Sequence, residues 1–455
     1  MVQENRHFIS VRIPDLLFLP CLGFSDQVVR ALVPIIYTVA TMAGVVQQVV
    51  SAVAQGNDLK ISMLLSIPKV TYVSKGGLLG PGAFQDPSFR WATEFSRKGL
   101  PQNWSEVFAA AFHARCALEG GKHQEAFDQA CAAYSKFLKM YETPEEEYWM
   151  KETLRVLAVN ARRIGKIRDA SGPRKPGKGL SWEVVEGLFK KGVQATAVSR
   201  APEKKGAAIG IFNNLFKLYF DNNAIRLCKQ LFKSANQICF RRGILDFDTL
   251  PLAQRVTYHF YKGRMAIFEE DYATADESFE FVLDNTPKAN RKNRLRTLHY
   301  SIPVKLYFGT YPSKELLKKY DLKEFDGIVQ ALRSGNIHLF RETLQEHQAF
   351  FILKGVYLLL EQLKMTVYRS LLFCAYKSLD RTNKIPLKVV LQALQKTGKR
   401  PIELDELECI VGSLISKGFL KGYISHKQAY LVLSKQNPFP DLVQLGKRRK
   451  ANSRR

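Results

Sequence analysis

Residues 384–435 restrict the fold of this chain more than any other segment, because the spacing of their apolar residues changes along the way. A short strand is predicted at 384–386. From 387 to 397 apolar residues recur every three or four positions, which predicts an amphipathic helix. A second helix is predicted at 404–417, because it begins with acidic residues that suit the positive helix end and stops at a glycine.

Two strands are predicted after these helices. Residues 420–424 and 429–434 are rich in aromatic and β-branched side chains, and the polar residues 425–427 separate them. This pattern is typical of a β-hairpin. A helix pair followed by a hairpin predicts a winged helix, a module that either binds nucleic acid or joins protein subunits.

The chain before this module is predicted to be helical, in stacked pairs. In the clearest pair, 254–285, the turn is at Glu270-Asp271. Its apolar positions are Tyr258, Tyr261, Ala266 and Phe268 on the first helix and Ala275, Phe279 and Leu283 on the second. A second pair is expected at 109–141, with its turn at Gly120-Gly121, and a third begins at Phe212. Such units are similar to tetratricopeptide (TPR) repeats, so the predicted fold is mainly α: a TPR-like solenoid followed by a C-terminal winged helix.

Several motifs carry a closer resemblance. They are QRVTY at 254–258, LLKKY at 316–320, HQAFF at 347–351, KGYISH at 421–426 and SKQNPFP at 434–440. A solenoid leading into a winged helix is the architecture of PCI domains. With these motifs the chain resembles the PCI domain-containing protein 2 family, the PCI subunit of the nuclear complex that couples transcription to mRNA export. The resemblance is dense from 212 to 442, and it thins from 56 to 200.

The resemblance implies a non-enzymatic subunit with several partners. These are a large PCI-like scaffold subunit, a small acidic subunit shared with the proteasome lid, and RNA or DNA, near nuclear pores. The alternative left open is a structural PCI subunit of the proteasome lid or signalosome that binds no nucleic acid. The expected parts are an N-terminal extension at 1–40, a helical-repeat region at 41–250 with a basic loop at about 161–205, the helical part of the PCI domain at 251–380, the winged helix at 381–436, and a basic tail at 437–455.

The charge of the chain favours polyanionic partners. Lysine and arginine number 68 against 42 acidic residues, a formal net charge of +26. Such an excess attracts phosphate-rich surfaces over long range. Nucleic acids and membrane surfaces are both negatively charged, so the positive charge predicts only that a partner is negatively charged.

The winged helix offers candidate nucleic-acid-binding residues. Basic side chains expected to contact phosphates are Lys388, Lys396, Lys399, Arg400, Lys417, Lys421 and Lys427, and Phe419 and Tyr423 are candidates for base stacking. The second helix begins with Glu403, Asp405, Glu406 and Glu408, which repel phosphate. We therefore expect sequence-independent backbone contacts without major-groove readout. A basic rim around a protein-docking module explains the same lysines equally well.

The C-terminal tail is a second basic element. Residues 446–455 contain no apolar residue able to anchor them, so they are expected to be disordered. Within them, Lys447, Arg448, Arg449 and Lys450 read as a nuclear import signal or as a phosphate-binding arm.

Signatures of enzymes and cofactor sites are weak. The cysteines occur singly, without metal-ligand spacing, which favours a reducing intracellular compartment. Residues 172–179, GPRKPGKG, nearly match a phosphate-binding loop, but Gly179 replaces the magnesium-binding Ser or Thr and no apolar strand precedes it. We expect no catalysis, no cofactor and no small-molecule substrate.

The apolar run 31–46 is too short to span a bilayer, which needs about 20 such residues. From Met42 the valines lie on one helical face, so a packed first helix of the solenoid is expected and no membrane contact.

Overall fold

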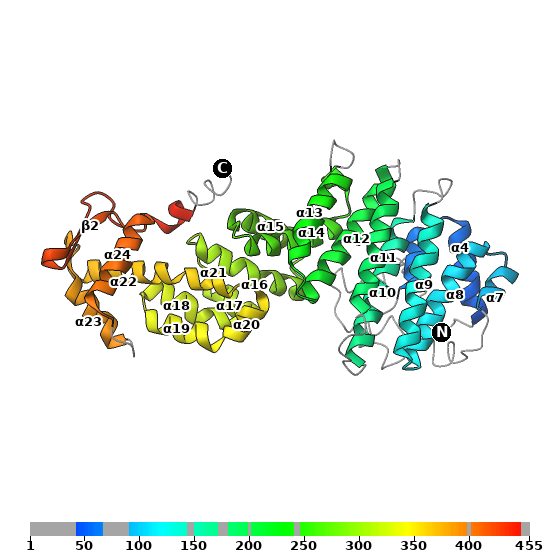
Figure 1. The fold of residues 1–455 in the computed structure, drawn as a ribbon, viewed down its shortest axis with the longest axis horizontal. Coiled ribbons are helices and arrows are strands. Elements are labelled where there is room, and N and C mark those ends of the chain that lie inside the picture. Colours follow the sequence, from blue (N-terminus) through cyan, green and yellow to red (C-terminus); the bar gives the residue numbers. More distant parts are fainter. Residues whose placement is uncertain are drawn as a thin grey trace, which may run out of the picture. The chain divides into compact units, whose positions relative to one another are not determined.

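The computed structural model describes residues 42–66, 91–142, 150–171, 181–198, 202–240, 246–397 and 402–446 (Figure 1). Contacts divide the chain into two compact units, Met1–Tyr261 and Lys262–Arg455. In the described part of the chain, the regular elements of the first unit are all helices, and the second unit carries both helices and a small sheet. The predicted fold class, a helical solenoid with a C-terminal winged helix, is confirmed.

The first unit is a row of helices that pack against their sequence neighbours. Figure 1 shows α8 to α12 side by side, and each of these helices contacts the next. The elements are α4 (Met42–Ala54), α5 (Asp58–Leu65), α7 (Trp91–Arg97), α8 (Gln102–Glu119), α9 (His123–Glu142), α10 (Lys151–Ser171), α11 (Ser181–Val198), α12 (Pro202–Asp221), α13 (Arg226–Ala235), the π turn η1 (Asn236–Phe240), the 3-10 turn η3 (Phe247–Thr249) and the first part of α14 (Leu252–Phe268).

Two predicted features of this unit are confirmed. The helix pair at 109–141 is α8 and α9, and Gly121 between them has a φ of 72°, which a residue with a side chain adopts only at a cost. The valine-rich segment from Met42 is α4, whose Val45, Val46 and Val49 are buried. Among the described residues, no helix is long and apolar enough to cross a membrane.

The basic loop predicted at about 161–205 is wrong over most of its length. Helix α10 continues to Ser171, and α11 fills 181–198. Ala161 and Ile164 are buried on α10, and Val185 and Phe189 are buried on α11. Arg162 and Arg168 on α10 are only half-exposed: Arg162 donates a hydrogen bond to Asn214, and the guanidinium group of Arg168 lies 4.7 Å from the ring centroid of Phe127. These basic residues therefore belong to packed helices. The phosphate-loop resemblance at 172–179 lies outside the described residues.

The second unit begins within α14 and continues through short helices. They are α15 (Tyr272–Asp284), α16 (Arg291–Tyr307), α17 (Lys314–Tyr320), the 3-10 turn η4 (Lys323–Phe325), α18 (Asp326–Ser334), α19 (Ile337–Glu346), α20 (Gln348–Lys354), α21 (Tyr357–Gln362) and α22 (Lys364–Ser378). The boundary between the units therefore lies inside a helix, some ten residues beyond the predicted one at 250.

The predicted pair at 254–285 corresponds to α14 and α15. Gly263 marks their close approach, because a Cβ atom there would lie 2.8 Å from the ring of Phe279. The predicted apolar face is buried except at its ends. Leu283 is half-buried, and Phe268, at the last position of α14, is exposed.

The winged helix is confirmed in its element order. It consists of β1 (Lys384–Pro386), α23 (Leu387–Thr397), α24 (Leu404–Ser416), β2 (Gly422–Ser425), the 3-10 turn η5 (His426–Gln428) and β3 (Tyr430–Leu433). The antiparallel sheet has the order β1-β3-β2, so β2 lies at an edge. Its core side chains are Ile385, Leu387, Val390, Leu394, Leu407, Val411, Leu414, Leu431 and Leu433.

The basic tail predicted at 437–455 is partly wrong. Phe439 is buried against Phe373 and Tyr376, with ring centroids 5.2 and 5.3 Å apart. Leu445 is also buried, and a Cβ on Gly446 would lie 2.3 Å from the carbonyl oxygen of Phe308. The segment up to residue 446 thus packs back onto the helices of its own unit, because it carries apolar side chains. The proposed import signal at 447–450 lies outside the described residues.

Candidate nucleic-acid interface

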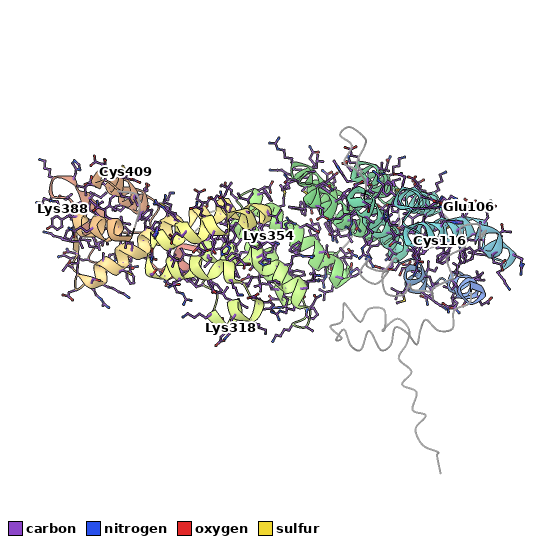
Figure 2. The ribbon with its side chains drawn as sticks, turned by 90° about the horizontal axis from the view of Figure 1, so that it is seen from below. Glu106, Cys116, Lys318, Lys354, Lys388 and Cys409 are labelled. Carbon is purple, nitrogen blue, oxygen red and sulfur yellow. The ribbon has the colours of Figure 1, made fainter. Side chains whose placement is uncertain are left out.

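The predicted phosphate-binding residues that the structure describes are exposed. Lys388 lies on the first turn of α23, Lys417 caps the end of α24, Lys421 precedes β2, and Lys427 lies in η5. Figure 2 labels Lys388 on the winged helix. Lys399 and Arg400 lie outside the described residues, as does the side chain of Lys396.

Strand pairing divides these lysines between two ends of the sheet. The backbone N–H of Leu387 donates to the carbonyl of Ala429 at 2.9 Å, which places Lys388 beside the turn that carries Lys427. We call Lys388 and Lys427 the wing-tip lysines. Lys421 precedes the other end of β2, about 13 Å from Ser425 along the strand. The predicted lysines therefore do not form a single patch.

Lys421 has a basic neighbour, Lys435, that the sequence analysis missed. The N–H of Ser434 donates to the carbonyl of Lys421 at 2.8 Å, so Lys435 follows directly across the hairpin. Lys435 is exposed, as is Lys417, which precedes β2. We call Lys417, Lys421 and Lys435 the strand-start lysines. Strand register could have revealed Lys435, because Gly422 pairs with Leu433, which places Ser434 opposite Lys421 and Lys435 one residue further.

The outer face of β2 combines a cation with an aromatic ring. Ile424 faces α24, since its Cδ1 is 3.9 Å from the position of a Cβ on Gly412. Side chains alternate along a strand, so Tyr423 and Lys421 lie on the opposite, outward face. Tyr423 is 64% exposed. This face can offer a ring to a base and an ammonium group to the adjoining phosphate.

Phe419 was wrongly predicted as a stacking residue. Its side chain is only 3% exposed, and it belongs to the core of the winged helix. Phe419 follows Gly418, whose φ of 74° ends α24 and turns the chain inward. An aromatic residue in this position fills the space under the sheet and has no free ring face for a base.

The wing tip has a mixed charge. Nδ1 of His426, in η5, lies 2.7 Å from a carboxylate oxygen of Glu408 on α24. This hydrogen bond, followed by the charges of Glu408 and Asp405, raises the pKa of His426 above its ordinary value of 6.5. The acidic start of α24 therefore lies beside the wing-tip lysines and weakens their attraction for phosphate. The strand-start lysines lie at the other end of the sheet.

Among the described residues, no group of histidine, cysteine, aspartate or glutamate side chains is arranged to hold a metal ion. On the helices of the second unit, Nε2 of His299 lies 3.1 Å from a carboxylate oxygen of Glu324, and the imidazole ring packs edge-on against Phe350.

Comparison with known proteins agrees with this architecture. The PCI domain family matches residues 344–435, which include the winged helix. PCI domain-containing protein 2 of Danio rerio is 34% identical over 352 residues, covering 75% of this chain and 86% of the relative. This chain belongs to the PCI domain-containing protein 2 family. The homologue from Dictyostelium discoideum is also 34% identical, over 75% of this chain and 80% of its own length.

Two further relatives carry other names. Enhanced ethylene response protein 5 of Arabidopsis thaliana is 34% identical over 79% of this chain and 85% of its own length. Protein CSN12 homolog of Mycosarcoma maydis is 27% identical over 70% of this chain and 76% of its own length. PCI-domain proteins typically assemble with other PCI subunits, which makes this chain a PCI-family structural subunit.

Proposed function

We propose that this chain is a non-enzymatic subunit of the nuclear complex that couples transcription to mRNA export. Its helices dock on the large PCI-like scaffold subunit, and it meets the small acidic subunit shared with the proteasome lid. Its winged helix contacts the backbone of RNA or DNA. Membership of the PCI domain-containing protein 2 family supports the proposal, together with the excess of basic residues.

One observation carries the nucleic-acid part of the proposal: Lys421 and Tyr423 share the outward face of an edge strand, with Lys417 and Lys435 beside them. A flexible single strand can place a base on the tyrosine and its phosphates on the lysines. The acidic start of α24 disfavours insertion of that helix into a major groove. The preferred ligand is therefore single-stranded, bound without sequence preference.

The test compares two matched variants of the full chain. Lys421→Glu/Lys435→Glu and Lys388→Glu/Lys427→Glu change the net charge equally, at opposite ends of the sheet. Affinity for fluorescein-labelled single-stranded RNA of mixed sequence is measured by anisotropy across salt concentrations. We expect the first variant to bind more weakly, with a salt slope flatter by about 1.4, because two phosphate contacts are lost. We expect the second variant to change less.

A purely structural PCI subunit, without nucleic-acid binding, is the second candidate. The mixed charge of the wing tip favours it, since carboxylates there compensate nearby lysines. RNA affinity that is undetectable in moderate salt for the wild-type chain, with co-purification of proteasome-lid or signalosome subunits, would select this function. Co-purification of the chain with the mRNA export complex from nuclei would select the function proposed first. Imaging of the tagged chain tests its proposed location at nuclear pores.

A further inference from the structure

An exposed apolar surface lies on the helical part of the second unit, away from the lysines of the wing. Leu353 is 82% exposed, the highest value for a large hydrophobic side chain among the described residues. Leu358 is 70% exposed and Ile352 is 56% exposed. They lie on α20 and α21, on either side of the turn at Gly355.

Phe268 extends this surface from a distant part of the sequence. Its ring lies 2.9 Å from the position that a Cβ on Gly355 would occupy, so the end of α14 lies against the turn. Phe268 is 45% exposed. We call Phe268, Ile352, Leu353 and Leu358 the α20–α21 patch.

The exposed side chains of the patch are not needed to form the core of the unit. Phe351 on α20 and Leu359 and Leu360 on α21 are fully buried, so the inner face of each helix is already apolar and filled. The outward side chains are additional apolar area exposed to water. Contiguous exposed apolar area of this kind marks interaction sites.

Positive charge borders the patch. Lys354 directly follows Leu353, and its ammonium group lies 5.3 Å from the ring centroid of Phe350. Partial burial, and then the charges of Arg264 and Arg296, lower the pKa of Lys354, while Glu324 has the opposite effect. We call Lys354, Arg264 and Arg296 the basic cluster.

The carboxylate near this cluster offsets its positive charge only in part, because it is shared with His299. Glu324 is held by His299, and the guanidinium group of Arg264 lies over the ring of Tyr300 at 4.9 Å. Like charges held close together favour an anionic partner, which relieves their repulsion. Glu269 and Glu361 are exposed on neighbouring segments, so the preference for an acidic partner is confined to the side facing Lys354.

We propose that the α20–α21 patch and the basic cluster together dock an amphipathic helix of a partner protein. The apolar stripe of that helix covers Leu353 and Leu358, and acidic residues on one flank face Lys354. A helix fits because the surface is built from helix ends and has no strand edge to extend. The inference rests on the proposed docking role and adds its location and the chemistry of the partner. It does not depend on RNA binding.

The first experiment identifies the covering segment. A photoreactive amino acid replaces Leu353 in the full chain, which is expressed in its native cells, cross-linked and digested, and the attached peptide is sequenced by mass spectrometry. We expect peptides with apolar residues at i, i+3 or i+4, and i+7, next to aspartate or glutamate. The control position is Val184, which is 46% exposed on α11 of the first unit. The inference is overturned by basic or non-amphipathic peptides, by peptides of this chain itself, or by none above the control.

The second experiment tests the charge with the captured sequence as a synthetic labelled peptide. Leu353→Glu/Leu358→Glu is expected to weaken its binding at least tenfold with an unchanged melting temperature, since both side chains are exposed. Lys354→Glu is expected to weaken binding of the peptide. A second peptide, with lysines in place of the aspartates and glutamates, is expected to bind the Lys354→Glu variant more tightly than the original peptide does. Equal binding by all variants would reject the patch even if RNA binding persists. If the wild-type chain binds the peptide but does not bind RNA, only the proposed nucleic-acid contact of the winged helix is rejected.

Discussion

The guanidinium group of Arg369 donates a hydrogen bond of 2.7 Å to the backbone carbonyl of Pro440. This bond joins α22 to the segment that follows the winged helix. Arg369 is buried, and its guanidinium group also lies 5.8 Å from the ring centroid of Phe439. The two residues are far apart in sequence, so their contact holds the winged helix and the helical part of the unit together through a third segment.

Arg369→Ala is expected to destabilise the second unit by about 2 kcal/mol, because it leaves a buried carbonyl without its charged donor. It is also expected to release the C-terminal segment. Thermal melting and limited proteolysis followed by mass spectrometry measure both effects. Arg333→Ala is the control, because Arg333 is exposed. Equal protection of residues 437–446 in the two variants would contradict this role for Arg369.

Gly335→Ala is expected to be strongly destabilising for two reasons. Gly335 has a φ of 76°, and a Cβ there would lie 2.3 Å from the backbone nitrogen of Leu371 on α22. Gly418→Ala is the matched control, since Gly418 has a φ of 74° but its Cβ would meet only Leu445, at 3.9 Å. The control is expected to cost about 1 to 2 kcal/mol from backbone strain alone. The melting temperature of the Gly335→Ala variant should fall well below that of the Gly418→Ala control. Equal melting temperatures in the two variants would argue against a steric clash at Gly335.

Phe419 and Tyr423 are expected to respond oppositely to replacement by alanine. Phe419→Ala removes a buried ring and should destabilise the winged helix by about 3 to 5 kcal/mol. Tyr423→Ala removes an exposed ring, so its melting temperature should stay close to that of the wild type. If Tyr423 stacks on a base, its variant should bind single-stranded RNA more weakly by about 1 to 3 kcal/mol. Unchanged anisotropy titrations for Tyr423→Ala would remove the stacking role.

The contact between His426 and Glu408 is expected to depend on pH. Because the pKa of His426 is raised in the folded chain, its contribution to stability is complete below the ordinary value of 6.5 and is lost as pH rises through the raised value. NMR titration of the imidazole ring measures this pKa directly. Glu408→Gln removes the charge and is expected to return the pKa of His426 toward 6.5. An unchanged titration midpoint in that variant would show that the contact does not form in solution.

The fold was largely predictable from local patterns, and the candidate site was predictable only in part. The helix pair α8 and α9 and the order of the winged-helix elements follow from apolar spacing and from glycine at the turns. The same kind of reasoning failed at 161–205, where basic residues obscured the buried positions of α10 and α11. It also left out Lys435, whose place beside Lys421 depends on pairing between strands.

The sequence by itself determined the element types, the positive charge and the family. Apolar spacing and short motifs involve residues that are close in sequence, and the net charge is a sum over the chain, so none of them requires knowledge of tertiary contacts. The tertiary structure decided which of those residues meet. Packing buried Phe419 and left Tyr423 exposed, although both are aromatic and close in sequence. It also placed Phe268 against Gly355 and bonded Arg369 to Pro440. Such contacts form between distant segments that share one core, and local spacing carries no information about them.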